Sequence, residues 1–184
     1  MKRRIAVFTI GHSTRSVDEF IGILKTHGIQ LAADVRTVPR SRHNPQFNSE
    51  ELAKALSENG IDYIHMKGLG GLRRPLKDSP NKGWKNASFR GFADYMQTEE
   101  FEEALNKLIA TAKKQRTSIM CAEAVPWRCH RSLISDALTA RGIEVQHLIG
   151  KNSVHPHKLT SWAKAEGTHI TYPESEATQE RLPI

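Results

Sequence analysis

Short apolar runs alternate with amphipathic segments along the first 150 residues of the chain. Brief runs of β-branched residues that end at turn signals predict buried strands, and apolar residues three and four apart predict helices. We therefore expect strands at 4–11, 29–36, 61–66, 117–122 and 143–149, and helices at 16–28, 48–60, 91–97, 98–115 and 131–142.

Local signals mark the ends of these helices. Ser16 followed by Glu19 has the spacing of a capping box, and Asn48 with Glu51 repeats it. A glycine placed directly after the last turn stops a helix, since it adopts the left-handed conformation without strain. Three expected helices end in this way, at Gly28, Gly60 and Gly142.

The alternation of strands with helices predicts an α/β fold with three layers. We expect a mostly parallel sheet of about five strands with flanking helices, which is a Rossmann-like arrangement. Residues 1–150 are predicted to form a single domain with a long basic loop at 67–90. Residues 151–184 are expected to be a polar, irregular extension that packs on this domain or trails from it.

Composition narrows the class of protein. The chain has 184 residues, of which 38% are hydrophobic, enough for one normal core. There is no apolar run of about 18 residues, so we expect no membrane partner. The apolar run after the basic start is short for a secretory signal, and two cysteines do not make a disulfide framework. We expect a cytoplasmic protein with reduced thiols.

The net charge of +7 is unevenly distributed. Residues 67–91 contain seven basic residues and one acidic residue. Such a segment can attract a nucleotide, a nucleic acid or another anion, although a solvated charged face is the commoner explanation. Trp84 in this loop is expected to be an exposed ring that can stack on a base.

Polar residues follow several of the predicted strands. Ligands of open parallel sheets bind outside the carboxyl ends of the strands, so these residues are expected to share one site. They are Gly11, His12, Ser13, Asp34, Arg36, Arg73, Arg74, Cys121, Glu123, Cys129, His130 and Arg131.

Two of these groups allow more than one interpretation. The turn Gly11–Thr14 can hold an anion with its backbone amides and hydroxyls, or it can be an ordinary turn. Asp34 and Arg36 lie two apart on one strand, so they face the same side. They can form a structural ion pair or hold a substrate.

The stretch "CAEAVPWRCHR", residues 121–131, contains both cysteines. Cys129 precedes a predicted helix and is surrounded by basic residues, which favours a thiolate. Glu123 is a candidate general acid or base. The first cysteine, Cys121, can instead be a packing residue of the core.

Two other kinds of site are alternatives for this stretch, a metal site and a cysteine-phosphatase loop. A metal site can be assembled from Cys121, Cys129, His130 and His12, although the spacing lacks the close pairs typical of metal sites. A cysteine-phosphatase loop is disfavoured, because six residues separate Cys121 from Arg128, one more than such loops contain.

The segments "TIGHSTRSVDEFIGILKTHGI", "DVRTVPRSRHNPQFN", "SFRGFADYMQT" and "MCAEAVPWRCHRSLISDAL" together resemble the bacterial and archaeal family known as domain of unknown function 488. The resemblance implies one cytoplasmic α/β domain with a shared polar site, and it implies no reaction. Its motif positions are His12, Ser13, Asp34, Arg36, Cys121, Glu123, Cys129, His130 and Arg131.

The leading hypothesis is a small enzyme, a hydrolase or transferase, that acts on a phosphate-bearing ligand such as a nucleotide or a nucleic-acid component. Glu123, Cys129 and His130, with Cys121 and Asp34, are the expected catalytic residues. Gly11, His12, Ser13 and four arginines, Arg36, Arg73, Arg74 and Arg131, would bind the ligand beneath the 67–90 loop. The alternatives are a non-enzymatic nucleic-acid-binding module and a metal-binding protein.

Overall fold

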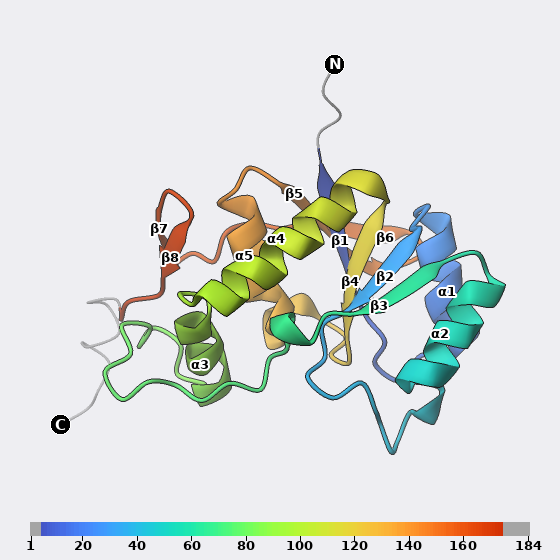
Figure 1. Cartoon of the computed structure of the whole chain (residues 1–184), viewed down its shortest axis with the longest axis horizontal. Coiled ribbons are helices and arrows are strands. Elements are labelled where there is room, and N and C mark those ends of the chain that lie inside the picture. The colour runs from blue at the N-terminus through green and yellow to red at the C-terminus, as the bar shows by residue number, and fades with distance from the viewer. Residues whose placement is uncertain (1–4, 175–184) are drawn as a thin grey trace.

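The computed structural model describes residues 5–174. Its main sheet has six strands in the order β3-β2-β4-β1-β5-β6 (Figure 1). The strands are β1 Ala6–Gly11, β2 Leu31–Asp34, β3 Asp62–His65, β4 Thr117–Cys121, β5 Glu144–Gly150 and β6 Ser153–Pro156. The first five run parallel, and β6 pairs antiparallel with β5. The expected α/β fold with a mostly parallel sheet is therefore confirmed.

Helices cover both faces of this sheet. They are α1 Val17–Thr26, α2 Ser49–Glu58, α3 Ala87–Tyr95, α4 Glu99–Lys114 and α5 Arg131–Thr139, with short 3-10 helices η1 Pro45–Phe47, η2 Lys67–Leu69 and η3 Pro126–Arg128. Two separate apolar clusters result, because neighbouring residues of a strand face opposite sides. Val7 packs with α4 and α5, whereas Phe8 and Ile10 pack with α1 and α2. This is the three-layer arrangement that the sequence predicts.

Most helix ends follow the expected signals. The Ser16 hydroxyl accepts a hydrogen bond from the Glu19 amide at 3.1 Å. Three glycines adopt positive φ at the expected stops, namely Gly28, Gly60 and Gly142. Asn48 differs: its side chain accepts from the Ser41 amide at 2.9 Å instead of capping α2, and so fixes the loop after β2.

Helix α3 begins at Ala87, four residues before the helix expected at 91–97. The reason is an N-cap: the Asn86 side chain accepts from the amides of Ser88 and Phe89 at 2.8 and 3.3 Å. The end of the predicted 67–90 loop is therefore helical.

The rest of the 67–90 segment is anchored to α3 through the buried carboxylate of Asp94. This group accepts hydrogen bonds from the Leu76 amide, the Ser79 hydroxyl and the Asn81 side-chain amide at 2.6–2.8 Å. Trp84 is half-buried, and its ring packs on Phe89, Trp162 and Tyr172. The expectation that Trp84 is an exposed ring is wrong, because residues near the C-terminus cover it.

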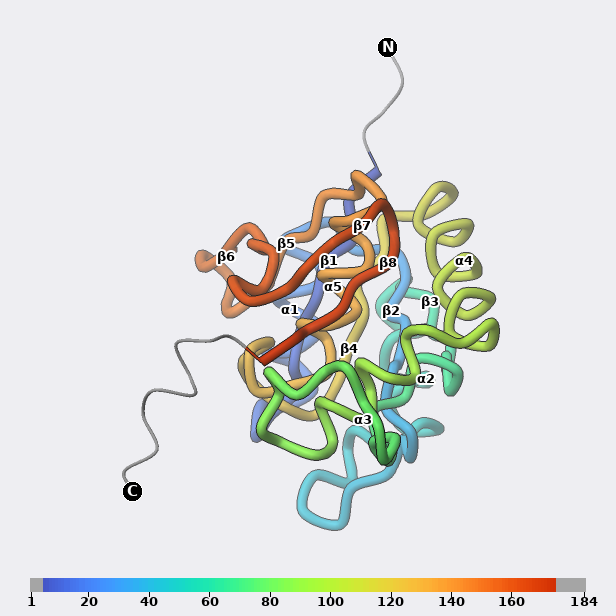
Figure 2. The backbone as a smooth tube through the Cα atoms, turned by 90° about the vertical axis from the view of Figure 1, so that its left-hand side faces the viewer, coloured from blue at the N-terminus to red at the C-terminus, as the bar shows by residue number. Residues whose placement is uncertain are grey.

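Those residues belong to the segment expected to be irregular. Besides β6, it forms the hairpin of β7 Lys164–Glu166 and β8 His169–Thr171, which lies beside α5 (Figure 2). Ile170 and Tyr172 are buried in the α4–α5 core. The irregular-tail expectation is therefore wrong for 153–156, 164–166 and 169–171, which form strands. The part of the expected extension at 175–184 lies outside the described residues.

Within residues 5–174, none of the helices has the length and apolar character that crossing a membrane requires.

Candidate functional site

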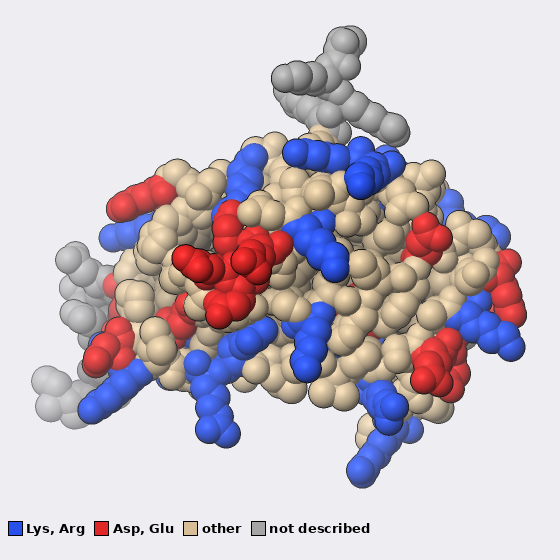
Figure 3. Space-filling model, viewed as in Figure 1, with Lys and Arg blue, Asp and Glu red and all other residues tan. Residues whose placement is uncertain are grey.

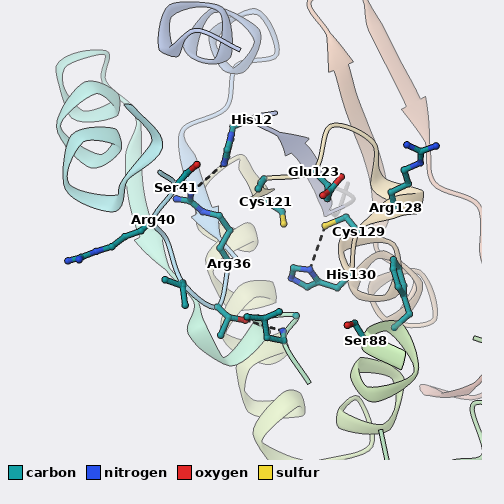
Figure 4. A pocket seen from close by; sticks show the side chains of 16 residues that line it. His12, Arg36, Arg40, Ser41, Ser88, Cys121, Glu123, Arg128, Cys129 and His130 are labelled. Carbon is teal, nitrogen blue, oxygen red and sulfur yellow. Dashed lines mark hydrogen bonds between the residues drawn. The ribbon is translucent and has the colours of Figure 1, made fainter. Parts of the chain in front are cut away.

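A cavity of about 440 Å³ opens at the carboxyl edge of the sheet, between the ends of β1, β2 and β4 and the start of α5 (Figure 4). We call it the edge cavity. It is lined by His12, Arg36, Thr37, Val38, Arg40, Ser41, Gly71, Leu72, Ser88, Phe89, Cys121, Ala122, Glu123, Arg128, Cys129 and His130.

Two thiols and an imidazole meet on the floor of the edge cavity. The ligand-capable atoms of Cys121, Cys129 and His130 all lie within 4.8 Å of one another. The Sγ of Cys129 is 3.6 Å from Nδ1 of His130. Both cysteines are buried and reduced. Cys121 ends β4, while η3 returns the chain so that Cys129 and His130 precede α5.

The environment of the two sulfurs differs. Burial disfavours a thiolate at Cys129, but contacts with Cys121, His130 and Arg131 outweigh it and lower the pKa of Cys129 well below that of a free thiol. The amide and Nε of Arg131 both donate to this sulfur at 3.5 Å. The contact with Cys129, and then burial, raise the pKa of Cys121. The contact between the two sulfurs therefore favours a proton on Cys121 over one on Cys129.

The imidazole of His130 is fixed in one orientation. Its Nε2 lies 2.9 Å from the carbonyl oxygen of Val35, and because a carbonyl only accepts, Nε2 carries a proton. In the neutral ring Nδ1 then presents a lone pair toward Cys129. Gly71 lies against the other side of this ring, where an added Cβ would be 2.6 Å from Nδ1.

Asp34 and Arg36 form a buried ion pair. Nη2 and Nε of Arg36 donate to the Asp34 carboxylate at 2.6–3.1 Å, and the Tyr63 hydroxyl donates to it at 2.7 Å. Burial opposes the charge of Arg36, but Asp34 more than offsets it, so the pKa of Arg36 is raised. Burial and the Asp34 charge raise the pKa of Tyr63. Asp34 does not line the cavity; it holds Arg36, which does.

His12 lies beside this pair, and Figure 4 shows its contact with Arg36. Nδ1 of His12 donates to the Ser13 carbonyl at 2.8 Å, so Nε2 accepts from Nη1 of Arg36 at 3.5 Å. The ring stacks on Phe47 with centroids 4.3 Å apart. Burial is the main reason that the pKa of His12 is lowered. His12 is thus a neutral ring that faces the cavity and is not one of the clustered donors.

Two amides of the Gly11–Thr14 turn already have backbone partners. The amides of His12 and Ser13 donate to the carbonyls of Cys121 and Ala122 at 2.9 and 2.8 Å, extending the β1–β4 pairing. A Cβ on Gly11 would overlap the Glu123 carbonyl oxygen, so this glycine permits close packing of the two loops. The amides of His12 and Ser13 are therefore not available to an anion, and neither Gly11 nor Ser13 lines the edge cavity.

The remaining predicted arginines occupy different places. Arg131 is buried, and its Nη2 donates to the Glu123 carbonyl at 2.5 Å, so it joins the turn after β4 to Cys129. Arg73 lies over the ring of Tyr95 at 3.5 Å, and Arg74 is exposed. None of the three lines the edge cavity, so the structure does not place them in direct contact with a ligand there.

The rim of the edge cavity is charged. Glu123, Arg40 and Arg128 are exposed, and the two arginines lie on opposite sides of the mouth (Figure 4). Among the described ion pairs, none involves these three residues. Lys and Arg side chains also gather along the lower edge of the surface in Figure 3, the edge to which the 67–86 loop belongs in Figure 1.

Sequence reasoning missed the apolar and hydroxyl-bearing wall of the cavity, formed by Thr37, Val38, Ser41, Leu72, Ser88 and Phe89. These residues come from loops and from the first turn of α3, where neither strand alternation nor helical spacing applies. In the sequence, only the turn residues around Pro39 and the N-cap residue Asn86 indicate where this wall begins.

A second buried polar network was also missed. Asp136 accepts from the Tyr172 hydroxyl at 2.7 Å and from Nε2 of His157 at 2.8 Å. His157 contacts His147 at 3.0 Å, and His147 contacts the Thr9 hydroxyl at 2.8 Å. Thr9 in turn accepts from Nη1 of Arg131 at 3.3 Å. The network therefore connects the C-terminal segment to the arginine that holds Cys129.

Comparison with known proteins identifies the family of this chain. No curated protein and no solved structure matches the chain. The family model described as domain of unknown function DUF488 matches residues 16–138, which include all of the edge-cavity residues except His12. The chain belongs to this family.

Proposed function

We propose that the protein is an enzyme that hydrolyses or transfers a group of a phosphate-bearing small molecule bound in the edge cavity. One observation carries this proposal: a cavity of about 440 Å³ is lined by arginines, by an exposed carboxylate and by a floor of two thiols and an imidazole. Such a convergence of polar groups in a well-formed cavity is typical of a catalytic site.

The arginines supply the anion-binding part. Arg36 is held by Asp34, and within the described residues its Nη1 has only the long contact with His12, so this group retains a hydrogen bond for a ligand. Arg40 and Arg128 are exposed at the mouth and can turn inward onto a bound phosphate. Guanidinium groups suit phosphate because they donate two parallel hydrogen bonds.

The wall supplies the remainder of the ligand site. Val38, Leu72 and Phe89 are apolar groups beside the arginines, and Ser41 and Ser88 are hydroxyls beside them. An anionic head with a flat or apolar body, as in a nucleotide, matches this lining. Because Asp94 anchors the 67–86 segment, Leu72 is part of a preformed wall rather than of a lid that closes.

Glu123 is the proposed proton acceptor. Its side chain is exposed and lines the cavity beside Cys121 and Cys129 (Figure 4). It takes the proton from an attacking water or hydroxyl, whose oxygen forms the new bond to phosphorus, and the leaving oxygen departs with a proton from solvent. A positioned acid or base of this kind contributes typically about 10²- to 10⁴-fold to the rate.

The test is turnover of a panel of nucleotides, phosphomonoesters and phosphodiesters, followed by phosphorus NMR. We expect at least one compound to be converted, and Glu123→Gln to lower kcat by at least 100-fold while binding is retained. Glu50→Gln, an exposed glutamate of α2, is the matched control and should behave as the wild type.

The proposal is overturned by the behaviour expected of a nucleic-acid-binding module. In that case no compound is turned over, oligonucleotides bind with an affinity that falls steeply with salt, and Glu123→Gln and Cys121→Ala leave this binding unchanged. The structure favours the enzyme, because Trp84 is covered and Lys85 and Arg90 have partners within the described residues.

A further inference from the structure

The floor of the edge cavity has the donor set of a transition-metal site. Cys121, Cys129 and His130 contribute two sulfurs and one ring nitrogen, all within 4.8 Å of one another. Around a tetrahedral Zn²⁺, with Zn–S of about 2.3 Å and Zn–N of about 2.0–2.1 Å, a sulfur and a nitrogen are about 3.6 Å apart. The Sγ of Cys129 and Nδ1 of His130 are 3.6 Å apart.

The histidine is oriented as a metal ligand requires. Nε2–H of His130 donates to the Val35 carbonyl, which fixes the tautomer and directs the Nδ1 lone pair at the cluster. A hydrogen bond from the second ring nitrogen to a carbonyl or carboxylate is the usual support of a ligating histidine. Gly71 leaves room for the ring in this position.

The sulfur ligands are supported in the same way. Arg131 donates its amide and its Nε to the Cys129 sulfur at 3.5 Å, which are hydrogen bonds that a metal-bound thiolate accepts. Two thiolates would also balance a divalent cation in charge. Thiolate and imidazole donors favour Zn²⁺ over oxygen-seeking Mg²⁺ or Ca²⁺.

We propose that Cys121, Cys129 and His130 bind one Zn²⁺ through three protein ligands and leave the fourth coordination position open to the edge cavity. His12 is not a ligand, because Nδ1 is committed to the Ser13 carbonyl and Nε2 to Arg36. Three protein ligands and an open position are the arrangement of catalytic rather than structural zinc. This inference deepens the proposed function, since the open position faces the bound phosphate-bearing ligand and Glu123.

The experiment uses full-length protein purified without an affinity tag and kept reduced. Elemental analysis is expected to find about one Zn²⁺ per chain. After removal of the metal by a chelator, titration with Co²⁺ alone should restore one equivalent and give the sulfur-to-cobalt charge-transfer absorption of a thiolate site. Neither readout depends on activity.

Variants assign the ligands. Cys121→Ser, Cys129→Ser and His130→Ala are each expected to weaken Zn²⁺ binding by at least 100-fold, while His12→Ala binds as the wild type. Circular dichroism establishes that each variant is folded. If a cysteine variant does not fold, the cobalt spectrum of the wild type still decides the proposal.

Two results overturn the zinc site. One is wild-type protein that, reduced and metal-free, takes up neither Zn²⁺ nor Co²⁺ in stoichiometric amount. The other is stoichiometric binding that persists in folded Cys129→Ser. The proposed function fails separately: it fails if no phosphate-bearing compound binds or reacts, whether or not the metal is present.

Discussion

Nδ1 of His130 faces Sγ of Cys129 at 3.6 Å, at the point where the chain passes from η3 into α5. The two residues are adjacent in sequence, yet the partner that orients the imidazole is distant in sequence. Val35, at the end of β2, fixes the imidazole, and Arg131 fixes the sulfur. The reactive floor of the edge cavity is therefore held by two different layers of the fold.

Gly71→Ala tests the position of the imidazole. A methyl group at this site would approach Nδ1 of His130 to 2.6 Å, so the ring must shift from its position beside the thiols. Changes around metal ligands typically cost about 10- to 100-fold, and we expect a loss of that size in Co²⁺ affinity, with the far-ultraviolet circular dichroism unchanged.

The control for this substitution is Gly22→Ala in α1, where the added methyl meets only the flexible end of Lys151. Co²⁺ affinity that is equal in Gly71→Ala, Gly22→Ala and the wild type would show that His130 needs no support from the 67–86 segment.

Asp34→Asn tests whether this carboxylate acts by holding Arg36. Removing one partner of a buried ion pair leaves an uncompensated charge and costs roughly 3–5 kcal/mol. We expect the free energy of unfolding, measured in urea, to fall by about 3 kcal/mol. Asp62→Asn, an exposed residue of β3 with one side-chain partner, should change it by less than about 1 kcal/mol. Equal effects of the two substitutions would contradict the positioning role.

Asp94→Ala tests the anchoring of the 67–86 segment. The substitution removes the acceptor for Leu76, Ser79 and Asn81 together. We expect faster amide hydrogen exchange and faster proteolysis within 70–86, while α1 and α2 keep their protection. Asp78→Ala, on the exposed part of the same segment, should leave exchange unchanged. Unaltered protection in Asp94→Ala would mean that other contacts fix this wall.

His147 predicts how stability depends on pH. Burial is the main reason that the pKa of His147 is lowered to about 3. The nearby charges of His157, Arg131 and His155 lower it further, and the charge of Asp136 opposes them. The unfolded chain therefore binds one more proton than the folded chain at pH values between about 3 and the ordinary histidine pKa of 6.5. Stability must rise with pH across this window, by at most about 1.4 kcal/mol per unit from this residue.

Urea denaturation at several pH values between 4 and 7 measures this slope. His147→Gln should flatten it, and His43→Gln, an exposed histidine of the loop after β2, should not. A slope that is the same in His147→Gln and the wild type would show that other groups cause the acid sensitivity.

The sequence predicts the fold well where local signals agree with tertiary packing. The Ser16 cap and the glycine stops are local interactions, and they appear as expected. The sequence does not predict the C-terminal strands, since the pairing of β6 with β5 and the burial of Tyr172 depend on contacts far along the chain. From the sequence alone, such a segment is recognised only as mostly polar.

The same distinction applies to the site. The sequence predicts that Cys121 and Arg36 belong to the site, because the carboxyl ends of parallel strands lie at one edge of the sheet. The sequence does not show that the amides of His12 and Ser13 pair with carbonyls at the end of β4, because that pairing depends on the sheet order. The His147 network depends on a fold in which β5, α5 and the C-terminal segment meet.

The central claim is that the edge cavity binds a phosphate-bearing molecule, and isothermal titration calorimetry tests it most directly. The ligands are pyrophosphate and a panel of nucleoside mono- and diphosphates. The proteins are the wild type, Arg40→Gln, Arg128→Gln and Arg42→Gln. Arg42 lies on the same loop as Arg40 and is exposed, but it does not line the edge cavity. We predict that at least one compound binds and that the Arg40 and Arg128 variants each bind it about tenfold more weakly, since a hydrogen bond to a charged group contributes roughly 1.5 kcal/mol or more. Arg42→Gln should bind as the wild type. Absence of binding by every compound, or equal weakening by all three substitutions, would contradict a phosphate-binding edge cavity.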